Sequence, residues 1–546
     1  MFGQRLHAGL RVIATIVTLV LGAVVTKSTA STGADYLTFH YDNLRTGWYP
    51  HETRLTQASV SSGGFSIVAT LAVDGNVYAQ PLYVRGVHMA SGTHNVLIVA
   101  SEYDSVYAFD ADSYALLWHT SFSNPSLGIG PASSGECNQI APWIGVSSTP
   151  VIDAAAGVVY VVAKTQQGSR PNAIFANTLH GLSLETGLDI TAPVLITGSV
   201  RGSDGKKLAF EQIQRNRTGL LLSRNRLYVG MGSNCDGSGG VVHGWVFAYS
   251  VPALTPAGVF NTATDVASTY LATLWQSTYG IAAAPDGSIF FATGNGAFDA
   301  YPTGNDYGDS VLRLTPALHV LDYFRPYNLA IEDDNDLGSG GVMLLPPRPG
   351  SLPDLALAAG KQGALYLLDR DHLGAFTPSG PDDVPAEIPF TGPGVFGGPA
   401  YFADATGASV YYALGDSPLV AYRLGTSPPT LTASSQTATT FPWGGTIPSV
   451  SSNGGRAGTA IVWAVVRSQN TGPSAPPLVL AAYDADDLSR TLFAGAFGAW
   501  QNAIGHAMLT PTIADGKVFV GGSASVTVFG LPAATRSRAR PLRQGG

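Results

Sequence analysis

Four side chains with useful chemistry fall between positions 275 and 361 of this 546-residue chain. They are Trp275 in LWQSTYG, Asn295 in TGNG, Asp336 in DNDLGSGG and Lys361 in AAGKQG. An indole ring can stack on a planar ligand, and an amide oxygen can bind a hard cation. A carboxylate can take a proton from a hydroxyl group, and an ammonium group can stabilise developing negative charge.

Each of these residues also has an ordinary structural explanation. Asn295 lies between two glycines, where asparagine is a common turn residue. Asp336 is one of four acids between positions 332 and 336, a run typical of a solvated loop, and Lys361 could be a surface residue before a glycine turn. Trp275 could equally belong to the core. Residue type alone leaves both explanations open for all four positions.

The segments that must position these residues repeat eight times along the chain. The clearest copy reads YAQPLYV, NVLIVAS, SVYAFDA and ALLWHTSF, from Tyr78 to Phe122, and the last copy runs from Leu509 to Leu531. Each copy takes about 55–60 residues and offers four short strands, which is the pattern of a propeller blade with large loops. The sequence therefore predicts an all-β fold, an eight-bladed β-propeller of four-stranded antiparallel blades.

The eighth copy lacks a fourth strand, whereas an unassigned apolar segment, Phe65–Val73, precedes the first copy. Pairing Phe65–Val73 with Ser525–Leu531 would close the ring and remove an open sheet edge. The alternative is an extra edge strand. We expect closure by the N-terminal strand, because the missing strand and the spare strand stand at opposite ends of the chain.

The antiparallel meander predicts where the four side chains lie. Successive connections in a meander alternate between the two ends of the sheet. Trp275 and Asp336 fall in blade-to-blade connections, and Asn295 and Lys361 fall in loops between second and third strands. All four residues should therefore lie on one face of the propeller, in adjacent blades.

The two ends of the chain predict export and disorder. Arg5 and Arg11 precede an apolar run, Val12–Val25, and small residues follow at Ser28–Ala30. This pattern predicts a signal peptide over 1–30 and a secreted or periplasmic protein, with an uncleaved anchor as the alternative. The propeller should occupy 31–532, and the basic, proline-interrupted tail 533–546 should be disordered.

The charge and the cysteine content of the chain indicate which partners and which cross-link to expect. The net charge is −8 without a basic stripe, so we expect no nucleic-acid partner. Because Val12–Val25 would leave with the signal peptide, we also expect no membrane span afterwards. The chain has two cysteines, Cys137 and Cys235, in loops expected on the same face. In an exported protein we expect them to form a disulfide, with two free thiols as the alternative.

The repeats resemble those of the pyrroloquinoline quinone (PQQ) dehydrogenases, the eight-bladed quinoprotein propellers. The likeness begins in YDNLRTGWYPHETRLTQASV and is sharpest from Ile289 to Arg370, where FFATGNGAFD, DYGDSVLRL, DNDLGSGG and AAGKQGALYLLDR follow one another. The resemblance implies PQQ and Ca²⁺ as cofactors and a small-molecule alcohol or sugar as substrate. No Cys-x-x-Cys-His haem motif is present, so electrons would leave to a separate acceptor.

The resemblance also implies a role for each candidate. Asp336 matches the catalytic carboxylate, Asn295 the amide ligand of Ca²⁺, and Lys361 the basic residue that contacts the quinone oxygens. Trp275 stands roughly where the family places the ring that stacks on the quinone. These roles define an oxidoreductase site for alcohol or sugar hydroxyl groups.

The sequence departs from the family pattern at two places. The adjacent cysteine pair that covers one side of the quinone is reduced to Cys137, and Lys164 stands near the expected position of a charged Glu ligand. A lysine there would repel Ca²⁺, or would replace its charge beside the cofactor. Non-catalytic relatives, such as the outer-membrane assembly lipoprotein, keep the repeat without the cofactor. The second function is therefore a non-catalytic scaffold that binds a protein or polysaccharide.

Overall fold

The computed structural model describes residues 34–135, 139–233, 242–266, 272–329, 334–390, 392, 394–468, 475–500 and 509–532. The predicted signal peptide, the basic tail, Cys137, Cys235 and the predicted disulfide lie outside these residues. The chain divides into residues 1–32 and a second unit from Gly33 onward, which is described here. Its described part contains one α-helix, α1 (Gln57–Ser61), and no helix long and apolar enough to cross a membrane.

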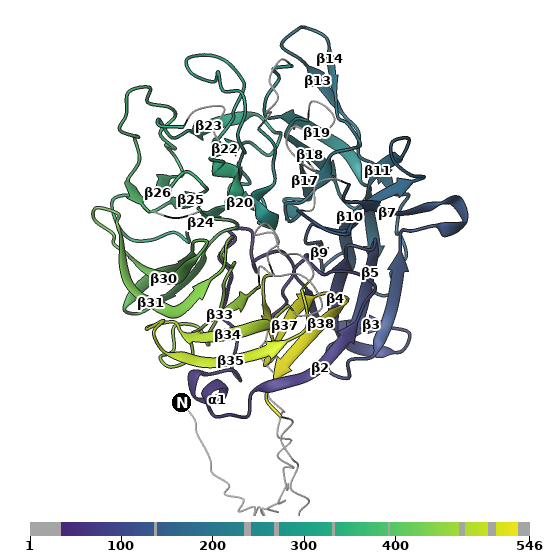
Figure 1. The fold of residues 1–546 in the computed structure, drawn as a ribbon, viewed down its shortest axis with the longest axis vertical. Helices are drawn as coiled ribbons and strands as arrows, with labels where there is room; N and C mark the ends of the chain where they lie inside the picture. The colour runs from purple at the N-terminus through teal and green to yellow at the C-terminus, as the bar shows by residue number, and fades with distance from the viewer. Residues whose placement is uncertain are drawn as a thin grey trace, which may run out of the picture. The chain divides into compact units, whose positions relative to one another are not determined.

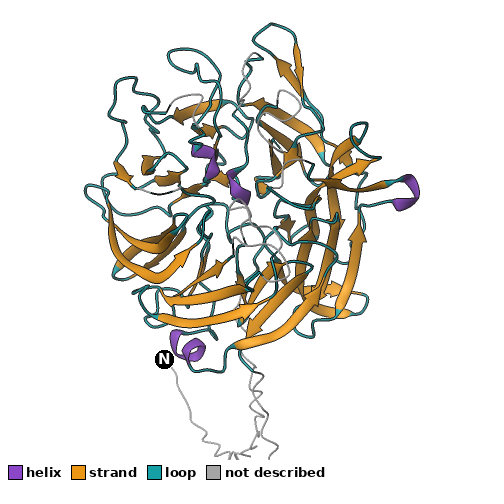
Figure 2. Cartoon of the chain, in the orientation of Figure 1, coloured by secondary structure: helices purple, strands orange, loops and turns teal. Residues whose placement is uncertain are grey.

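Eight antiparallel sheets of four strands form a ring of blades in the described residues, as predicted (Figure 1). Figure 2 shows how little of the chain is helical. The first four blades are β3 (Leu82–Met89), β4 (Gly92–Ser101), β5 (Ser105–Asp110) and β6 (Leu116–Ser121); β9 (Val151–Asp153), β10 (Val158–Gln167), β11 (Ile174–Ser183) and β12 (Val194–Leu195); β16 (Leu221–Ser223), β17 (Arg226–Gly232), β18 (Trp245–Ser250) and β19 (Thr255–Asn261); and β20 (Ala282–Ala283), β21 (Ile289–Ala292), β22 (Val311–Leu314) and β23 (Val320–Phe324).

The remaining blades continue the same pattern. They are β24 (Val342–Leu344), β25 (Leu355–Ala359), β26 (Ala364–Asp369) and β27 (Ala386–Pro389); β28 (Ala400–Asp404), β29 (Gly407–Ala413), β30 (Ser417–Leu424) and β31 (Leu431–Phe441); β32 (Ser449–Ser451), β33 (Ile461–Val466), β34 (Leu478–Asp484) and β35 (Thr491–Phe497); and β36 (Thr512–Ala514), β37 (Lys517–Gly522), β38 (Ser525–Gly530) and β2 (Ser66–Ala72). The middle strands are buried because each blade packs between two others; every residue of β5 and β21 is buried.

The last blade confirms the predicted ring closure. Strand β2 pairs antiparallel with β38, from Ser66 opposite Gly530 to Ala72 opposite Ser525. In Figure 1 the purple N-terminal strand lies directly beside the yellow C-terminal one. The side chain of Leu71 is buried in the adjoining core. The pairing covers the edge of β38 that would otherwise offer free backbone groups to another chain.

Further strands extend this plan and were not predicted from the sequence. In the second blade, β7 (Ile129–Ser133) pairs with the end of β10, and β8 (Trp143–Ile144) pairs with β7. Strands β13 (Ser199–Arg201) and β14 (Lys207–Ala209) form a separate hairpin. Strand β15 (Arg215–Asn216) adds to β17 in the third blade.

The N-terminal segment, residues 36–49, hydrogen-bonds to the innermost strands of six blades. Backbone bonds join it to Tyr83, Ile152, Ala283, Leu344, Tyr401 and Val450 in turn. Its last two residues form β1 (Trp48–Tyr49), parallel to β32. The buried Arg45 guanidinium donates to Thr38 and to the carbonyl oxygens of Phe39, Leu220 and Ile281. This segment links blades that are far apart in the sequence.

Candidate functional site

Loops on one face of neighbouring blades bring the four candidate residues together. Trp275 lies before β20 and Asn295 follows β21, whereas Asp336 lies before β24 and Lys361 follows β25. These are the two loop classes that the meander places at one end of the blades. The four residues come from segments separated by up to about 90 positions, yet they form one set of contacts.

The Asp336 carboxylate is at the centre of these contacts. Its Oδ1 accepts a 2.7 Å hydrogen bond from the backbone N–H of Asn295, and its Oδ2 accepts a 2.6 Å bond from the Lys361 ammonium. The backbone N–H of Lys361 also donates to the Asp336 carbonyl oxygen, at 2.9 Å. Asp336 is only 1% exposed, so these charge-assisted bonds fix its orientation in a poorly solvated place.

Lys361 connects the carboxylate to the aromatic ring. Its ammonium donates a second 2.6 Å bond, to Asp334 at the exposed rim, and lies 5.4 Å from the centre of the Trp275 ring. Burial disfavours the charged ammonium, but the two carboxylates outweigh burial and raise the pKa of Lys361. Lys361 is therefore a cation throughout the physiological pH range.

A second cation, Arg217, contacts the same ring. The Arg217 guanidinium lies 5.3 Å from the centre of the Trp275 ring, a cation–π distance. Trp275 also packs in a buried cluster with Phe39, Tyr279 and Phe396. Sequence reasoning missed Arg217, although QRNRTG belongs to the same class of blade-to-blade connection as Trp275 and Asp336.

Gly294 allows the ring and the carboxylate to approach each other. A Cβ atom at this position would lie 2.8 Å from Asp336 Oδ1 and 3.2 Å from Trp275 Nε1. Only glycine leaves the backbone free to run between them. The TGNG motif therefore has a packing reason, besides the turn that it forms.

Asp309 supports the turn that carries Asp336. It is 1% exposed, and its Oδ1 accepts a 3.2 Å bond from the backbone N–H of Leu337, the first residue of a 3₁₀ turn (Leu337–Ser339). Burial and the nearby Asp336 charge raise the pKa of Asp309 well above its usual value. Asp309 was not among the predicted residues; it follows DYG and stands two residues before β22, the third strand of its blade.

Glu102 is a further buried acid on the same face. Its Oε2 accepts bonds from the Gly145 N–H at 2.7 Å and from the Ser147 hydroxyl at 2.9 Å. Burial raises the pKa of Glu102 to about 7, against the lowering effect of these bonds and of Arg215 and Arg217. Its charge therefore interacts with the guanidinium that lies on Trp275.

The backbone of this propeller is similar to that of solved proteins, whereas its sequence is not close to known families. No protein-family model matches the chain, and no curated protein matches it. Solved structures do: the quinohemoprotein alcohol dehydrogenase from Comamonas testosteroni is 15% identical with a TM-score of 0.60, over 95% of this chain and 84% of that one. The chain has the fold of the quinoprotein alcohol dehydrogenases.

Two further quinoprotein structures show the same similarity. A europium-containing methanol dehydrogenase is 12% identical with a TM-score of 0.59, over 91% of this chain and 98% of that one. The quinohemoprotein alcohol dehydrogenase ADHIIG from Pseudomonas putida HK5 is 14% identical with a TM-score of 0.57, over 94% and 82% of the respective chains. At this low identity the structural similarity shows the fold alone, and the chemistry has to be argued from the residues of the site.

Lys164, the predicted replacement for a charged ligand in the quinoprotein pattern, has an extensive set of backbone partners. Its ammonium donates to the carbonyl oxygens of Gln212, Ile213 and Gln214, at 2.9, 3.2 and 2.7 Å. Burial and the neighbouring Arg215 lower the pKa of Lys164 to about 7. With three protons donated, Lys164 anchors the segment that leads to Arg217. A contact between Lys164 and a cofactor stays a prediction and would require one of these bonds to break.

Proposed function

We propose that this protein is a quinoprotein-type oxidoreductase that oxidises alcohol or sugar hydroxyl groups. The observation that carries the proposal is the contact set of Asp336, which joins Asn295, Lys361 and, through Lys361, the Trp275 ring. The quinoprotein fold places this set in the loops of adjacent blades. The solved proteins of this fold include alcohol dehydrogenases, which supports the same class of reaction here.

Asp336 is the proposed base. Its Oδ2 faces Lys361, so a substrate hydroxyl that hydrogen-bonds to this carboxylate would also lie near a fixed cation. Asp336 would accept the hydroxyl proton while Lys361 stabilises the charge that develops beside it. Asn295 holds Oδ1 through its backbone N–H, which keeps the carboxylate in one orientation during the transfer. The low exposure of Asp336 limits competition from water.

The residues around Trp275 fit a planar, anionic quinone such as PQQ. Lys361 and Arg217 supply two cations within 5.4 Å and 5.3 Å of the centre of the indole ring; because Trp275 is only 7% exposed, a quinone that stacks on it would displace one of these cations from the ring. Trp275, Lys361 and Arg217 are therefore the residues that would hold such a cofactor. When bound, PQQ supplies a two-electron acceptor for the hydrogen removed from the carbinol carbon.

The donor set fits Ca²⁺ poorly. Among the described residues, no group of three or more His, Cys, Asp or Glu side chains could hold one metal ion. Asn295 is the predicted amide ligand, but the ammonium of Lys361 lies 2.6 Å from an oxygen of the Asp336 carboxylate and competes with a metal for that charge. A hard cation usually takes six or more oxygen ligands, several of them charged. We therefore derive no step that depends on Ca²⁺.

The remaining parts of the proposal concern the cellular setting. An exported location rests on the predicted signal peptide over residues 1–30, and a separate electron acceptor on the missing haem motif. The absence of PQQ binding would favour the alternative function, a non-catalytic scaffold for a protein or polysaccharide.

Dye-linked oxidation by the full chain reconstituted with PQQ tests the proposal. A panel of primary alcohols and aldoses is offered with an artificial electron acceptor, and Asp336→Asn is compared with Asp334→Asn. Both carboxylates bind Lys361, but only Asp336 is buried, with a side chain 1% exposed against 81% for Asp334. We expect Asp336→Asn to lower kcat/KM by about 100-fold or more, the usual contribution of a general base, and Asp334→Asn to change it little.

Two outcomes would count against the proposal. The first is the absence of PQQ-dependent oxidation by the wild type with any substrate of the panel. The second is an equal loss in the two variants at unchanged thermal stability, because a base role assigns the loss to Asp336 alone.

A further inference from the structure

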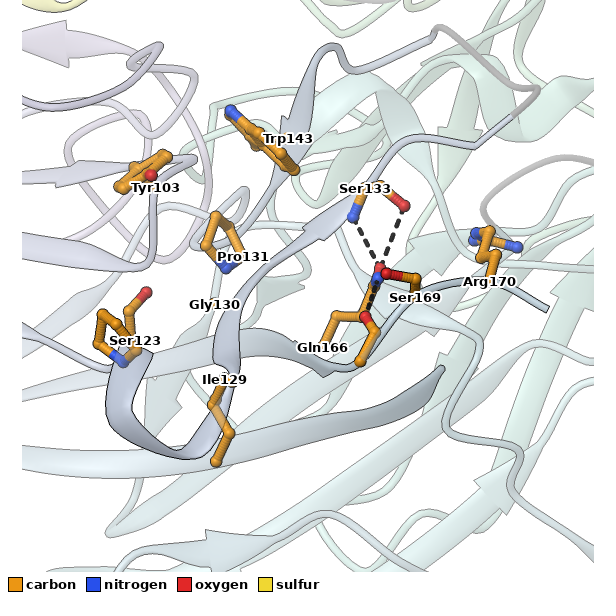
Figure 3. Close-up of a pocket in the computed structure, with 13 residues that line it drawn as sticks. Tyr103, Ser123, Ile129, Gly130, Pro131, Ser133, Trp143, Gln166, Ser169 and Arg170 are labelled. Carbon is orange, nitrogen blue, oxygen red and sulfur yellow. Dashed lines mark hydrogen bonds between the residues drawn. The ribbon is translucent and has the colours of Figure 1, made fainter. Parts of the chain in front are cut away.

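A pocket lies at the junction of the first two blades, lined by residues between Tyr103 and Arg170. The proposed base, Asp336, is far from it in the sequence. Strands β10 and β11 are ten residues long, and the end of β10 pairs with β7 instead of an inner blade strand. Strand β8 extends the same edge. The extra strands thus form a wall that the propeller plan does not require (Figure 3).

The pocket against this wall has the size of a small-molecule site. Its volume is about 540 Å³, and strand β7 forms its base with Ile129, Gly130 and Pro131. Two aromatic residues, Tyr103 and Trp143, line one side, and Ser169 and Arg170 line the other (Figure 3). Pockets of about 300–1,000 Å³ with aromatic walls and a few placed polar groups are typical ligand sites.

The aromatic side of the pocket leaves two large rings partly exposed to water, although burying them would stabilise the fold more. Tyr103 and Trp143 are 38% and 40% exposed, and their rings pack edge to face at 6.1 Å. Both rings keep apolar surface in water while holding each other in one orientation. Such rigid, half-exposed rings offer a platform to a ligand that has an apolar face and polar edges.

On the polar side of the pocket, internal hydrogen bonds hold Gln166 in place, whereas Ser169 and Arg170 are exposed. Gln166 Oε1 accepts bonds from the N–H and hydroxyl of Ser133, and Gln166 Nε2 donates to the Gly168 carbonyl. These bonds, seen in Figure 3, fix the wall. Ser123 also lines the pocket, but its hydroxyl oxygen is buried and has no hydrogen-bond partner among the described residues, so it is not offered to a ligand. Arg170 also lines the pocket, and its guanidinium lies 5.0 Å from the centre of the Phe175 ring.

A second pocket adjoins the first and shares its aromatic side. It has a volume of about 220 Å³ and is lined by Tyr103, Trp143, Asp74, Asn76 and Glu102. Because Tyr103 and Trp143 line both pockets, a ligand can contact the pair from either side. The combination suits a chain of several similar units better than one compact molecule. Carboxylates at one end and Arg170 at the other favour a ligand with hydroxyl groups over one with net charge.

We propose that these two pockets bind a neutral oligosaccharide across the Tyr103–Trp143 pair. The pyranose ring combines a C–H face, which packs on an aromatic ring, with equatorial hydroxyl groups that reach Ser169, Arg170 and Asp74. None of the pocket residues belongs to the Asp336 contact set; Glu102, in the second pocket, is coupled to it only through its charge interaction with Arg217. Binding can therefore be measured without any quinone.

Isothermal titration of the full chain, without PQQ, tests this proposal with maltotetraose, cellotetraose and chitotetraose as probes. We expect saturable binding of at least one probe, with a change in tryptophan fluorescence. Trp143→Ala should weaken this binding at least about tenfold, and Tyr103→Ala should weaken it less. Tyr301→Ala is the matched control, because Tyr301 is an exposed aromatic residue, 50% exposed, outside both pockets.

The result that would overturn the proposal is the absence of heat and fluorescence change for all three sugars. Equal affinity of the wild type and Trp143→Ala would overturn it as well, because the sugar would then bind elsewhere. Circular dichroism and melting temperature show that each variant is folded, and Ser169→Ala provides a second, milder change at the polar side. Failure of sugar binding with intact PQQ-dependent oxidation would refute this inference alone.

Discussion

Oδ2 of Asp336 accepts a 2.6 Å hydrogen bond from the ammonium of Lys361, and both groups are largely removed from water. The pair links two loops of the same blade, the entry to β24 and the turn between β25 and β26. Breaking one partner of a buried pair leaves an uncompensated charge, which is far costlier than the pair is worth. This relationship makes Lys361 the most informative position for a stability measurement.

Lys361→Met should lower the free energy of unfolding by about 3 kcal/mol at pH 7, because Asp336 would stay buried without its cation. The raised pKa of Lys361 means that its stabilising effect is complete below the unfolded pKa of lysine, about 10.4, and is lost as the pH rises through the folded pKa. Urea denaturation at pH 7 and in strongly alkaline buffer measures both. Lys361→Arg keeps the charge and is the control; equal stability of wild type and Lys361→Met at pH 7 would contradict the pairing.

Asp309 should act as a neutral hydrogen-bond acceptor. Burial and the nearby Asp336 charge raise the pKa of Asp309 well above its usual value, which favours the neutral form, and Asp309→Asn keeps an acceptor oxygen without a charge. Asparagine also tolerates the positive φ of 51° at this position. We expect Asp309→Asn to keep the melting temperature and kcat/KM near those of the wild type, and Asp309→Ala to lower both by releasing the Leu337 N–H. A large loss in Asp309→Asn would show that Asp309 works as an anion.

Glu102 should make the protein less stable as the pH rises from about 4.5 to about 7. Its folded pKa of about 7 lies above the ordinary value of 4.5, so the folded state binds the extra proton in this window. Glu102→Gln removes the titration and should exceed the wild type in unfolding free energy by about 2–4 kcal/mol at pH 8, with near equality at pH 4.5. Denaturant titrations at several pH values provide the measurement. A constant difference between the two proteins across this window would refute the assignment.

Deleting β2 should convert the protein into an aggregating species. Without Ser66–Ala72, the free edge of β38 exposes unpaired backbone groups. Size-exclusion chromatography with light scattering is the measurement. Replacing the β13–β14 hairpin, Ser199–Ala209, by a short glycine linker is the matched control and should leave the elution unchanged, because that hairpin closes no blade. A monodisperse β2 deletion would mean that the closing strand is dispensable.

The blade plan was predictable because every blade repeats the same local signals. Alternating turn residues and short apolar runs mark the strands, and the spare segment Phe65–Val73 identified the closing strand, observed as Ser66–Ala72. The meander then placed Trp275, Asn295, Asp336 and Lys361 on one face. Their hydrogen bonds and ring contacts, in contrast, depend on loop conformations that no repeat encodes.

Other features had no local signal at all. The N-terminal segment carried part of the family resemblance, but nothing in it signals its bonds to six blades or the carbonyl oxygens of Leu220 and Ile281 that accept from the buried Arg45 guanidinium. The three carbonyl partners of Lys164 lie almost 50 residues further along the chain, after the β13–β14 hairpin. Because the sequence does not reveal these partners, it suggested that the Lys164 charge replaces a metal ligand. The roles proposed for Arg217 and for the Tyr103–Trp143 pair likewise depend on contacts between loops that are distant in the sequence.

The most direct test of the central claim is an equilibrium titration of the full chain with PQQ, followed by tryptophan fluorescence and by equilibrium dialysis. We predict saturable binding in the micromolar range or tighter, unchanged by EDTA because Lys361 already neutralises Asp336, and weakened at least about tenfold by Trp275→Leu. The absence of PQQ binding at about 100 μM, with and without Ca²⁺, would contradict the account, since affinities weaker than this do not support a resident cofactor.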